Sequence, residues 1–585
     1  MMYEARLVIK HSIILVSIGC VSTAAGFFGS KTMVLPRSQS INAARHLVGW
    51  QDQINRAKAP DRYWSLAITP AYERTMGGSL NNYLLQDVTK MTFSGSLAPN
   101  RGAHDILADY FGLPLDFVSC VTMAPVISNF IMDFDFYYGL ERVTPGLYFE
   151  LYAPIVQANW NLDMDETIIN AGSLGFPAGY MAATDVPFNQ FSVDSVITAF
   201  QGFTTFGDMK QPLKYGTIYG REEKVQICDP QVIIGYNFLR HDNYLLGANV
   251  RAYLPVGNRI NQRYLFNPIV GDAHRWQLGF GIDAHATLWH DEASHMKALV
   301  YLEANITHIF AGKQLRSYDF KGSHGSRYML LETLASTAQQ LLINGTPAPQ
   351  QYVGELLPAI NATTLLSKVK INVQADIALK LALVYKQFTI DLGYEFWGRS
   401  KEKLVDRHCF PDNLYALKGD AQVYGFTNQI ANGDGGFPAN GVAVALNATE
   451  HAATLHGGQG NGNFVSGAQL QNLNVDNPAV AQTSGGNLTN ITAADAASFG
   501  FVQANAHTSS PAILLTDADI DNHSPLASHA ISNKIFLHGN YTWKSTDYVP
   551  YMGIGVEAEF AANTCNQHNS ALSQWGVWLK GGFSH

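Results

Sequence analysis

The segment 368–397 constrains the fold of this chain more than any other part of its sequence. Every odd position from Val369 to Leu383 is apolar, and most of the even positions are polar or charged. Since successive side chains of a strand point to opposite faces, this pattern predicts a ribbon with one apolar and one polar face. The pattern repeats over 388–396, after a turn at Tyr385 and Lys386.

The length of these two segments indicates a membrane. Strands of soluble domains are usually about five or six residues long, whereas a transmembrane β-strand needs roughly nine to eleven. We therefore expect a membrane-spanning hairpin, with a long amphipathic hairpin of a soluble sandwich as the alternative. Of the 585 residues, 47% are hydrophobic and 15% are charged, against roughly 25% charged in typical soluble domains. No run of about eighteen apolar residues follows the N-terminal leader, which excludes ordinary transmembrane helices.

The N-terminus has the residue order of a secretory signal peptide. Arg6 and Lys10 precede the apolar stretch 12–19, and small residues follow up to Ala24 and Ala25. This order predicts a signal peptide over 1–25, with a buried N-terminal helix as the alternative.

Residues 26–60 form a separate N-terminal segment. Ile41, Ala44, Leu47 and Ile54 recur at roughly helical spacing, which predicts a short helical segment. Three placements are open: the periplasm, the lumen of a barrel as a small plug, or a linker. The cysteines beyond the leader are widely spaced and form no C-x-x-C motif, so the sequence predicts neither a metal site nor a cofactor.

Alternating segments recur along 61–585, and the connections between them alternate in length. Short turns fall near 141–146, 240–243, 290–295, 385–387 and 544–547. Short periplasmic turns and long outer loops are typical of outer-membrane barrels. We expect an all-β fold, a transmembrane antiparallel up-and-down β-barrel of about fourteen strands, with twelve or sixteen as alternatives.

Two segments bear on this count. About twelve strands can be placed from Lys90 onward, whereas Tyr63–Tyr72, the first strand candidate, does not fit the alternation of short and long connections. The largest outer loop, 427–521, is rich in Gly, Ala, Asn, Ser and Thr and has few charges. This composition is typical of a low-complexity segment.

The C-terminus resembles the β-signal by which Gram-negative outer-membrane proteins are recognised for barrel assembly. Its alternating residues are Trp575, Val577, Leu579, Gly581 and Phe583, although Ser584 and His585 follow where the signal usually ends the chain. Most of the mature chain resembles porin-like outer-membrane barrels as a group. The resemblance implies a bacterial outer-membrane location, contact with outer-membrane lipid, the barrel-assembly machinery as a partner, and the homo-oligomers that porins often form.

Charged residues on the polar faces are expected to line the lumen. They are Asp133, Asp135, Glu150, Arg251, Arg275, Asp283, Glu303, Lys368, Lys370, Asp376, Lys380, Asp391, Glu395, Glu557, Glu559 and Lys580. A dry lumen would have to pair every one of them, because an isolated buried charge is very costly. The sequence therefore favours a water-filled channel for passive diffusion of small hydrophilic solutes, with 161–221 and 312–365 as constriction loops. A lumenal salt-bridge network that closes the barrel is the alternative.

The sequence leaves two other functions open. Fatty-acid transporters of the outer membrane are barrels with a short N-terminal hatch, and inward Tyr148, Tyr152 and Trp578 could line a path for hydrophobic compounds. A second alternative is a scaffold whose loop 427–521 binds a surface or another cell. We expect no enzymatic activity, because the clusters at His241 and His290 lie in short turns. The net charge of -9, without a basic block, makes nucleic acid an unfavourable partner.

Overall fold

Twelve antiparallel strands close a barrel in the computed structural model of the chain. The structure describes residues 32–49, 53–55, 63–77, 80, 90–177, 179–335, 342–343, 346–347, 352–420, 423–426, 443–445, 449–458, 513–543, 548–562 and 569–585. The barrel strands are β1 (Trp64–Thr75), β5 (Val126–Gly139), β6 (Leu147–Tyr152), β10 (Gln231–His241), β11 (Tyr244–Tyr253), β12 (Gln277–Asp291), β13 (Met296–Ser317), β18 (Thr364–Tyr385), β19 (Phe388–Arg399), β24 (Ala530–Thr542), β25 (Val549–Ala561) and β26 (Gln574–Ser584).

Each barrel strand pairs with the next one along the chain, which is the expected up-and-down order. The strand β1 closes the barrel, because it pairs with β5 on one edge and with β26 on the other. The expected count of about fourteen strands is not confirmed, and the barrel has twelve, which is one of the two alternatives given with it. The segment Tyr63–Tyr72 belongs to the first barrel strand, whereas β2 (Lys90–Ser94) is five residues long and lies in a separate small sheet.

The barrel presents an apolar outer surface. In β19, the side chains of Phe388, Ile390 and Leu392 are more than half exposed. Asp391 and Glu395, which lie on the other face of the same strand, are buried. An apolar band on the outside of a closed barrel is the surface that hydrocarbon requires, and closure leaves no strand edge unpaired in lipid. The chain is thus a closed β-barrel with an apolar outer surface, in agreement with the expected location in the bacterial outer membrane.

The alternation in β18 changes phase near its middle. Val369 and Ile371 are fully buried, whereas Val373 is 49% exposed. The pairing of β18 with β13 shifts register at this change, because Thr307 pairs with Gln374 and Ile309 with Ile371, which leaves one extra residue in β18. A shift by one residue exchanges the two faces of a strand. For this reason Lys368 is exposed and Lys370 half-buried, contrary to the expectation that both point into the lumen.

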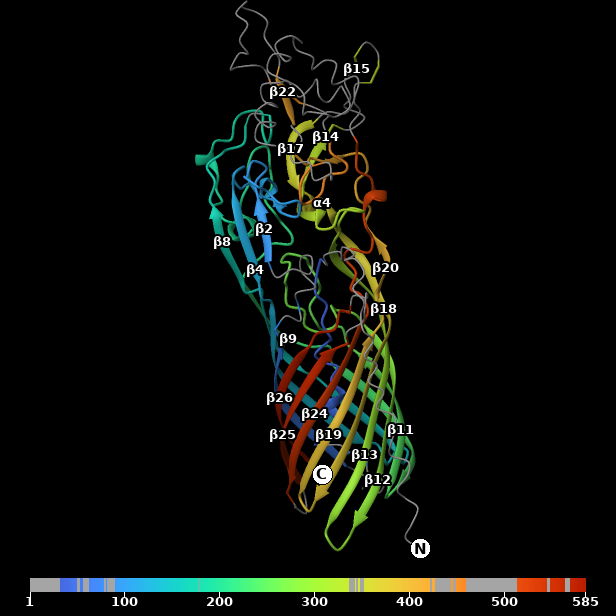
Figure 1. Cartoon of the computed structure of the whole chain (residues 1–585). Helices are drawn as coiled ribbons and strands as arrows, with labels where there is room; N and C mark the ends of the chain where they lie inside the picture. The colour runs from blue at the N-terminus through green and yellow to red at the C-terminus, as the bar shows by residue number, and fades with distance from the viewer. Residues whose placement is uncertain are drawn as a thin grey trace, which may run out of the picture.

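The long connections build a second layer, which we call the cap, at the end of the barrel opposite the short turns (Figure 1). Its sheets contain β2, β3 (Ile106–Leu107), β4 (Val118–Met123) and β8 (Met164–Asn170), and separately β14 (Leu330–Leu334), β17 (Tyr352–Pro358) and β21 (Tyr415–Leu417). At the junction, β7 (Ile155–Asn161) and β9 (Arg221–Ile227) extend the sheet beyond β5, and β20 (Glu402–Arg407) pairs with β18.

The remaining elements are short. They are α1 (Ala43–Leu47), η1 (Ala108–Phe111), η2 (Phe188–Gln190), α3 (Val196–Phe200), η3 (Ser326–Tyr328), β15 (Leu342–Ile343), β16 (Thr346–Pro347), α4 (Ala359–Thr363), β22 (Tyr424–Phe426), β23 (Ala443–Ala445) and η6 (Asp517–Asp519). Among the helices that the structure describes, none has both the length and the apolar character needed to cross a bilayer.

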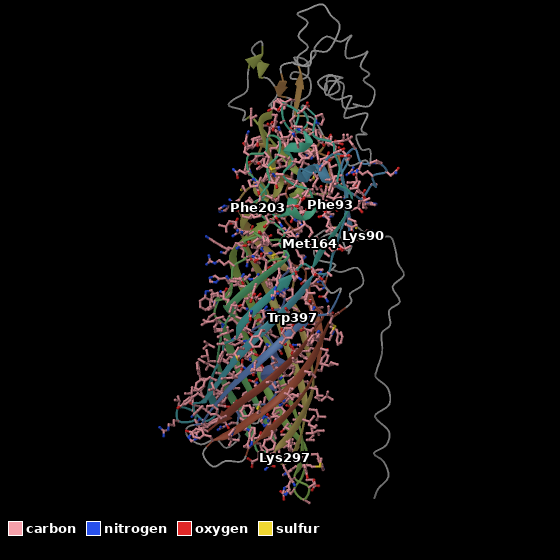
Figure 2. All side chains as sticks on the ribbon, turned by 90° about the vertical axis from the view of Figure 1, so that its left-hand side faces the viewer. Lys90, Phe93, Met164, Phe203, Lys297 and Trp397 are labelled. Atoms are coloured by element: carbon pink, nitrogen blue, oxygen red, sulfur yellow. The ribbon has the colours of Figure 1, made fainter. Side chains whose placement is uncertain are left out.

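An aromatic core holds the cap together. The Phe200 ring lies 4.7 Å from Phe111 and 5.2 Å from Tyr328, measured between centroids, and Phe93 packs against both phenylalanines. Figure 2 shows Phe93 and Phe203 in the cap, far from Lys297 at the turn end of the barrel. Phe200 and Tyr328 come from the two connections expected to constrict the lumen, so these parts of the connections pack on each other in the cap.

Candidate functional site

The N-terminal segment passes through the barrel from the cap end to the turn end. Near the cap, Arg399 at the end of β19 donates a hydrogen bond of 2.9 Å to the main-chain oxygen of Leu35. Near the turns, Ser584 donates one of 2.8 Å to the Gln53 side chain, and Tyr137 donates one of 3.1 Å to Asn55. We call the described residues 32–49 and 53–55 the plug. Of the three placements that the sequence leaves open, these residues occupy the lumen.

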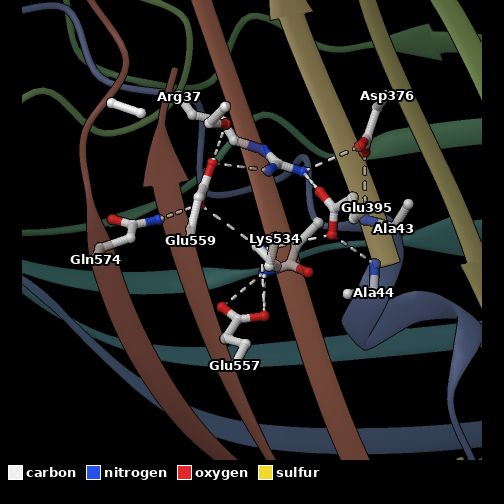
Figure 3. Close-up of polar contacts among 12 residues, drawn as sticks. Arg37, Ala43, Ala44, Asp376, Glu395, Lys534, Glu557, Glu559 and Gln574 are labelled. Atoms are coloured by element: carbon white, nitrogen blue, oxygen red, sulfur yellow. Dashed lines mark hydrogen bonds and ion pairs between the residues drawn. The ribbon is translucent and has the colours of Figure 1, made fainter. Parts of the chain in front are cut away.

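Arg37 anchors the plug to three strands of the wall. Its guanidinium lies 3.1 Å from the Asp376 carboxylate in β18 and 3.4 Å from Glu559 in β25, and it forms an ion pair with Glu395 in β19 (Figure 3). The main-chain N–H groups of Ala43 and Ala44 donate to Asp376 and Glu395. The plug thus satisfies these two carboxylates with both a side chain and the backbone.

Arg45 makes a second anchor on the adjoining arc of the barrel, which shares β25 with the first. Its Nε lies 2.9 Å from the Asp133 carboxylate of β5, its Nη1 forms an ion pair with Glu73 of β1, and Glu557 of β25 is 3.8 Å away. Asn42 donates a hydrogen bond of 3.2 Å to Glu557. All five side chains are buried, so these ion pairs are shielded from water.

His46 completes the contact between the plug and the wall. Its two ring nitrogens lie 2.5 Å from Glu150 of β6 and 2.9 Å from Glu303 of β13. Because a neutral imidazole has only one N–H, the two carboxylates together favour the protonated ring, which can donate to both. Arg37, Arg45 and His46 therefore connect the plug to most of the circumference of the barrel.

Lysines and arginines of the wall bind many of the remaining lumenal charges. Lys534 of β24 lies 3.2 Å from Glu557 and 3.5 Å from Glu395, so it links the two arginine sites (Figure 3). Lys380 pairs with Asp391 at 3.2 Å, and Arg251 with Glu303 at 3.6 Å. The lumen is thus a network of ion pairs that includes both the wall and the plug.

Most of the charges assigned to the lumen from the sequence are buried inside the barrel. These are Asp133, Asp135, Glu150, Arg251, Asp283, Glu303, Asp376, Lys380, Asp391, Glu395, Glu557, Glu559 and Lys580. Arg275 is buried at the junction with the cap, where it pairs with Asp272 and Glu402. Lys368 and Lys370 lie on the other face, as described above. The residues of the C-terminal signal lie on β26, where Trp575, Val577, Leu579 and Phe583 are exposed on the lipid-facing side.

Sequence reasoning did not find Arg37, Arg45 and His46 as partners of the wall. The signal that could have found them is the charge of the segment: residues 32–49 contain these three basic side chains and no aspartate or glutamate. A basic segment next to a barrel with many inward carboxylates predicts that the segment enters the lumen. The inward aromatics Tyr148, Tyr152 and Trp578 are buried, and Tyr148 stacks on Tyr137 and donates a hydrogen bond of 2.8 Å to Asp283.

Two small cavities lie beside the plug among the described residues. A cavity of about 20 Å³ lies next to Arg37 and Trp397, and another of about 10 Å³ lies next to His46 and Tyr152. A water molecule needs at least about 10–15 Å³ of such volume, so each cavity holds one water or two at most. The expectation of an open, water-filled lumen is not supported, because the plug occupies the space between the walls.

An apolar cluster runs from the cap past the plug to the inner wall. Leu35 and Val48 of the plug pack in the same cluster as Phe93 and Phe200 of the cap and Ile131 of the barrel. The interior is thus apolar toward the cap and charged around the plug. A compound that moved along it would meet both kinds of surface.

Comparisons with known proteins give remote similarities of fold. No protein-family model and no curated protein matches the chain. A solved outer-membrane channel from Pseudomonas putida F1 aligns at 8% identity with a TM-score of 0.33, over 90% of this chain and 97% of that one. A Pseudomonas aeruginosa FadL homologue aligns at 8% identity with a TM-score of 0.27, over 96% and 99%. The Pseudomonas putida toluene transporter TodX aligns at 9% identity with a TM-score of 0.20, over 96% and 98%. At TM-scores this low, the similarities do not bear on function.

Proposed function

We propose that the protein is a gated outer-membrane channel for hydrophobic compounds, and that the plug closes it at rest. The continuous apolar cluster from the cap to the inner wall supports this proposal. An apolar compound would make favourable contacts with its side chains between the cap and the plug. The filled lumen argues against a passive porin for small hydrophilic solutes.

Transport then requires the plug to move, because the cavities beside it are too small for an organic molecule. The plug is joined to β1 through residues 56–62, so it stays tethered when it moves. Its contacts with the wall are both polar, through Arg37, Arg45 and His46, and apolar, through residues such as Leu35 and Leu47, so opening has to break both kinds of contact.

A disulfide between the plug and the wall tests the proposal. Ala43 of the plug and Ala378 of β18 belong to one buried cluster, so Ala43→Cys with Ala378→Cys places one thiol on the plug and one on the wall within that cluster. Cys409 and Cys565 are replaced by serine in the background. Uptake of the fluorescent apolar compound N-phenylnaphthylamine by cells that make the protein is then measured before and after oxidation.

We expect oxidation to abolish the uptake due to the double variant, and reduction to restore it. Either single-cysteine variant should transport normally under both conditions. Equal uptake by the locked and unlocked forms would overturn the proposal, because a fixed plug would then be compatible with transport.

A further inference from the structure

The inner wall carries more acids than bases. Its buried carboxylates are Glu73, Asp133, Asp135, Glu150, Asp283, Glu303, Asp376, Asp391, Glu395, Glu557 and Glu559, whereas the buried lysines and arginines of the barrel strands are Arg251, Arg316, Lys380, Arg399, Lys534 and Lys580. Among the described residues, the plug supplies much of the missing positive charge through Arg37, Arg45 and His46.

Movement of the plug leaves these carboxylates without their partners. Removing one member of a buried ion pair is costly, because the remaining charge is left uncompensated. A cation that replaced Arg37 or Arg45 would recover part of that free energy, and an anion would add to the repulsion. The wall therefore discriminates by charge once the plug has moved.

The Arg37 position has the features of a built site for a planar cation. Three carboxylates from three strands converge on the guanidinium, which also lies 5.5 Å from the centre of the buried Trp397 ring. Guanidinium groups favour both bidentate carboxylate contacts and aromatic faces. The Trp397 indole N–H has no hydrogen-bond partner among the described residues, and Trp397 lines the cavity of about 20 Å³ beside Arg37.

We propose that Asp376, Glu395, Glu559 and Trp397 form a binding site for the positively charged group of the transported compound, and that Arg37 occupies this site as an internal substitute in the closed state. The inference deepens the proposed function, on which it rests: it assigns the channel to apolar compounds that carry an amidinium, guanidinium or ammonium group. Acidic rings select cations in other pores by the same electrostatic effect.

Chemical rescue of Arg37→Ala tests this site. The thermal unfolding of the refolded variant is followed in detergent with benzamidine, a planar aromatic cation, and with benzoate, an anion of similar shape. We expect benzamidine to raise the melting temperature of Arg37→Ala, to leave the wild type almost unchanged, and to bind about tenfold or more tightly than benzoate. Arg240→Ala, which removes an arginine paired with Glu141 outside the plug, is the matched control and should not respond.

A second variant removes the excess negative charge. Arg37→Ala combined with Glu395→Gln should fold at least as well as Arg37→Ala alone, because one unpaired carboxylate is gone, and it should lose most of the response to benzamidine. In planar bilayers, Arg37→Ala with Arg45→Ala should give channels that favour K⁺ over Cl⁻ several-fold and that benzamidine blocks. The further Glu395→Gln change should weaken both effects.

The outcomes separate this inference from the proposed function. Equal effects of benzamidine and benzoate, or an unchanged response after Glu395→Gln, would overturn the cation site while leaving a gated channel in place. Normal uptake through the disulfide-locked plug would overturn the gated channel, and rescue by benzamidine would then show that the site binds cations without serving that transport.

Discussion

Lys580 of the last strand donates a hydrogen bond of 2.8 Å from its ammonium group to the main-chain oxygen of Arg45 in the plug. The same ammonium lies 3.8 Å from Asp135 of β5. The strand that closes the barrel is therefore also one that holds the plug.

Replacing Lys580 should loosen the plug without opening the wall. Lys580→Met keeps a long apolar stem but removes the donor, so the Arg45 oxygen and Asp135 lose a partner. We expect a lower free energy of unfolding, by about 1–3 kcal/mol, and more frequent channel openings in planar bilayers. Lys297→Met, at the exposed turn end, is the control and should change neither quantity. Unchanged gating by Lys580→Met would mean that Lys580 does not hold the plug.

A lumenal glycine should be intolerant of even a methyl group. Gly393 lies directly opposite Phe536 in the sheet, and a Cβ atom at Gly393 would overlap the Phe536 ring. Gly393→Ala forces the ring to move, and we expect a loss of about 1–3 kcal/mol in the free energy of unfolding. A Cβ at Gly539 of the neighbouring strand meets no atom within 4 Å, so Gly539→Ala should be close to neutral. Equal effects of both changes in urea unfolding would contradict this packing.

The junction between barrel and cap depends on Glu402. This carboxylate lies 2.9 Å from Arg275 and 2.9 Å from Arg316, and all three side chains are buried. Glu402→Gln removes the negative charge that both arginines contact. We expect a loss of about 3–5 kcal/mol in the free energy of unfolding.

The matched control for Glu402→Gln is an acid at a more exposed ion pair. Asp517 pairs with Arg407, and its side chain is 36% exposed, so Asp517→Asn should cost at most about 1 kcal/mol. Limited proteolysis of the cap should accelerate in Glu402→Gln only. A loss for Asp517→Asn as large as that for Glu402→Gln would show that burial does not set the cost.

The cap contains a carboxyl group that should make stability fall with rising pH. Burial raises the pKa of Glu332 well above its ordinary value, and Lys418 opposes that shift only in part. Neither carboxylate oxygen has a hydrogen-bond partner among the described residues. Because the pKa of Glu332 is higher in the folded than in the unfolded state, protonation of Glu332 stabilises the folded protein. This contribution to the free energy of unfolding is fully present below the unfolded pKa of about 4.3, and it is lost as the pH rises toward the folded pKa.

Glu332→Gln should therefore flatten the dependence of stability on pH. We expect the free energy of unfolding of the variant to rise relative to that of the wild type from about pH 5 to pH 8, as measured by denaturant unfolding. Glu292→Gln, in an exposed turn, should follow the wild-type curve. A curve for Glu332→Gln that parallels the wild type over this range would mean that Glu332 is ionised in the folded protein.

The period-two pattern was sufficient to predict strands such as β19. Phe388, Ile390 and Leu392 point outward there as expected, because neither a bulge nor the cap interrupts the alternation. The same pattern failed at Lys368 and Lys370, since a register shift between strands leaves no mark on the hydrophobic period.

The contacts between the plug and the wall could not be predicted from the sequence, for a different reason. Arg37 and Asp376 are 339 residues apart, and nothing in the local sequence of either one indicates the other. Inward carboxylates were predicted from the strands one by one, but their partners were sought within the wall. The charge of the lumen is balanced only when a segment outside the strands is included, and periodicity carries no information about such a segment.

The course of the plug has a consequence for biogenesis. The plug precedes β1, and the barrel closes when β26 pairs with β1, so a segment that comes before the first strand lies inside a ring that the last strand completes. Threading Arg37 and Arg45 through a finished ring would strip both charges of water before their partners were reached. The plug must therefore lie between the strands before β26 pairs with β1. Pairing of the last strand with the first is thus the step that follows the assembly of the interior.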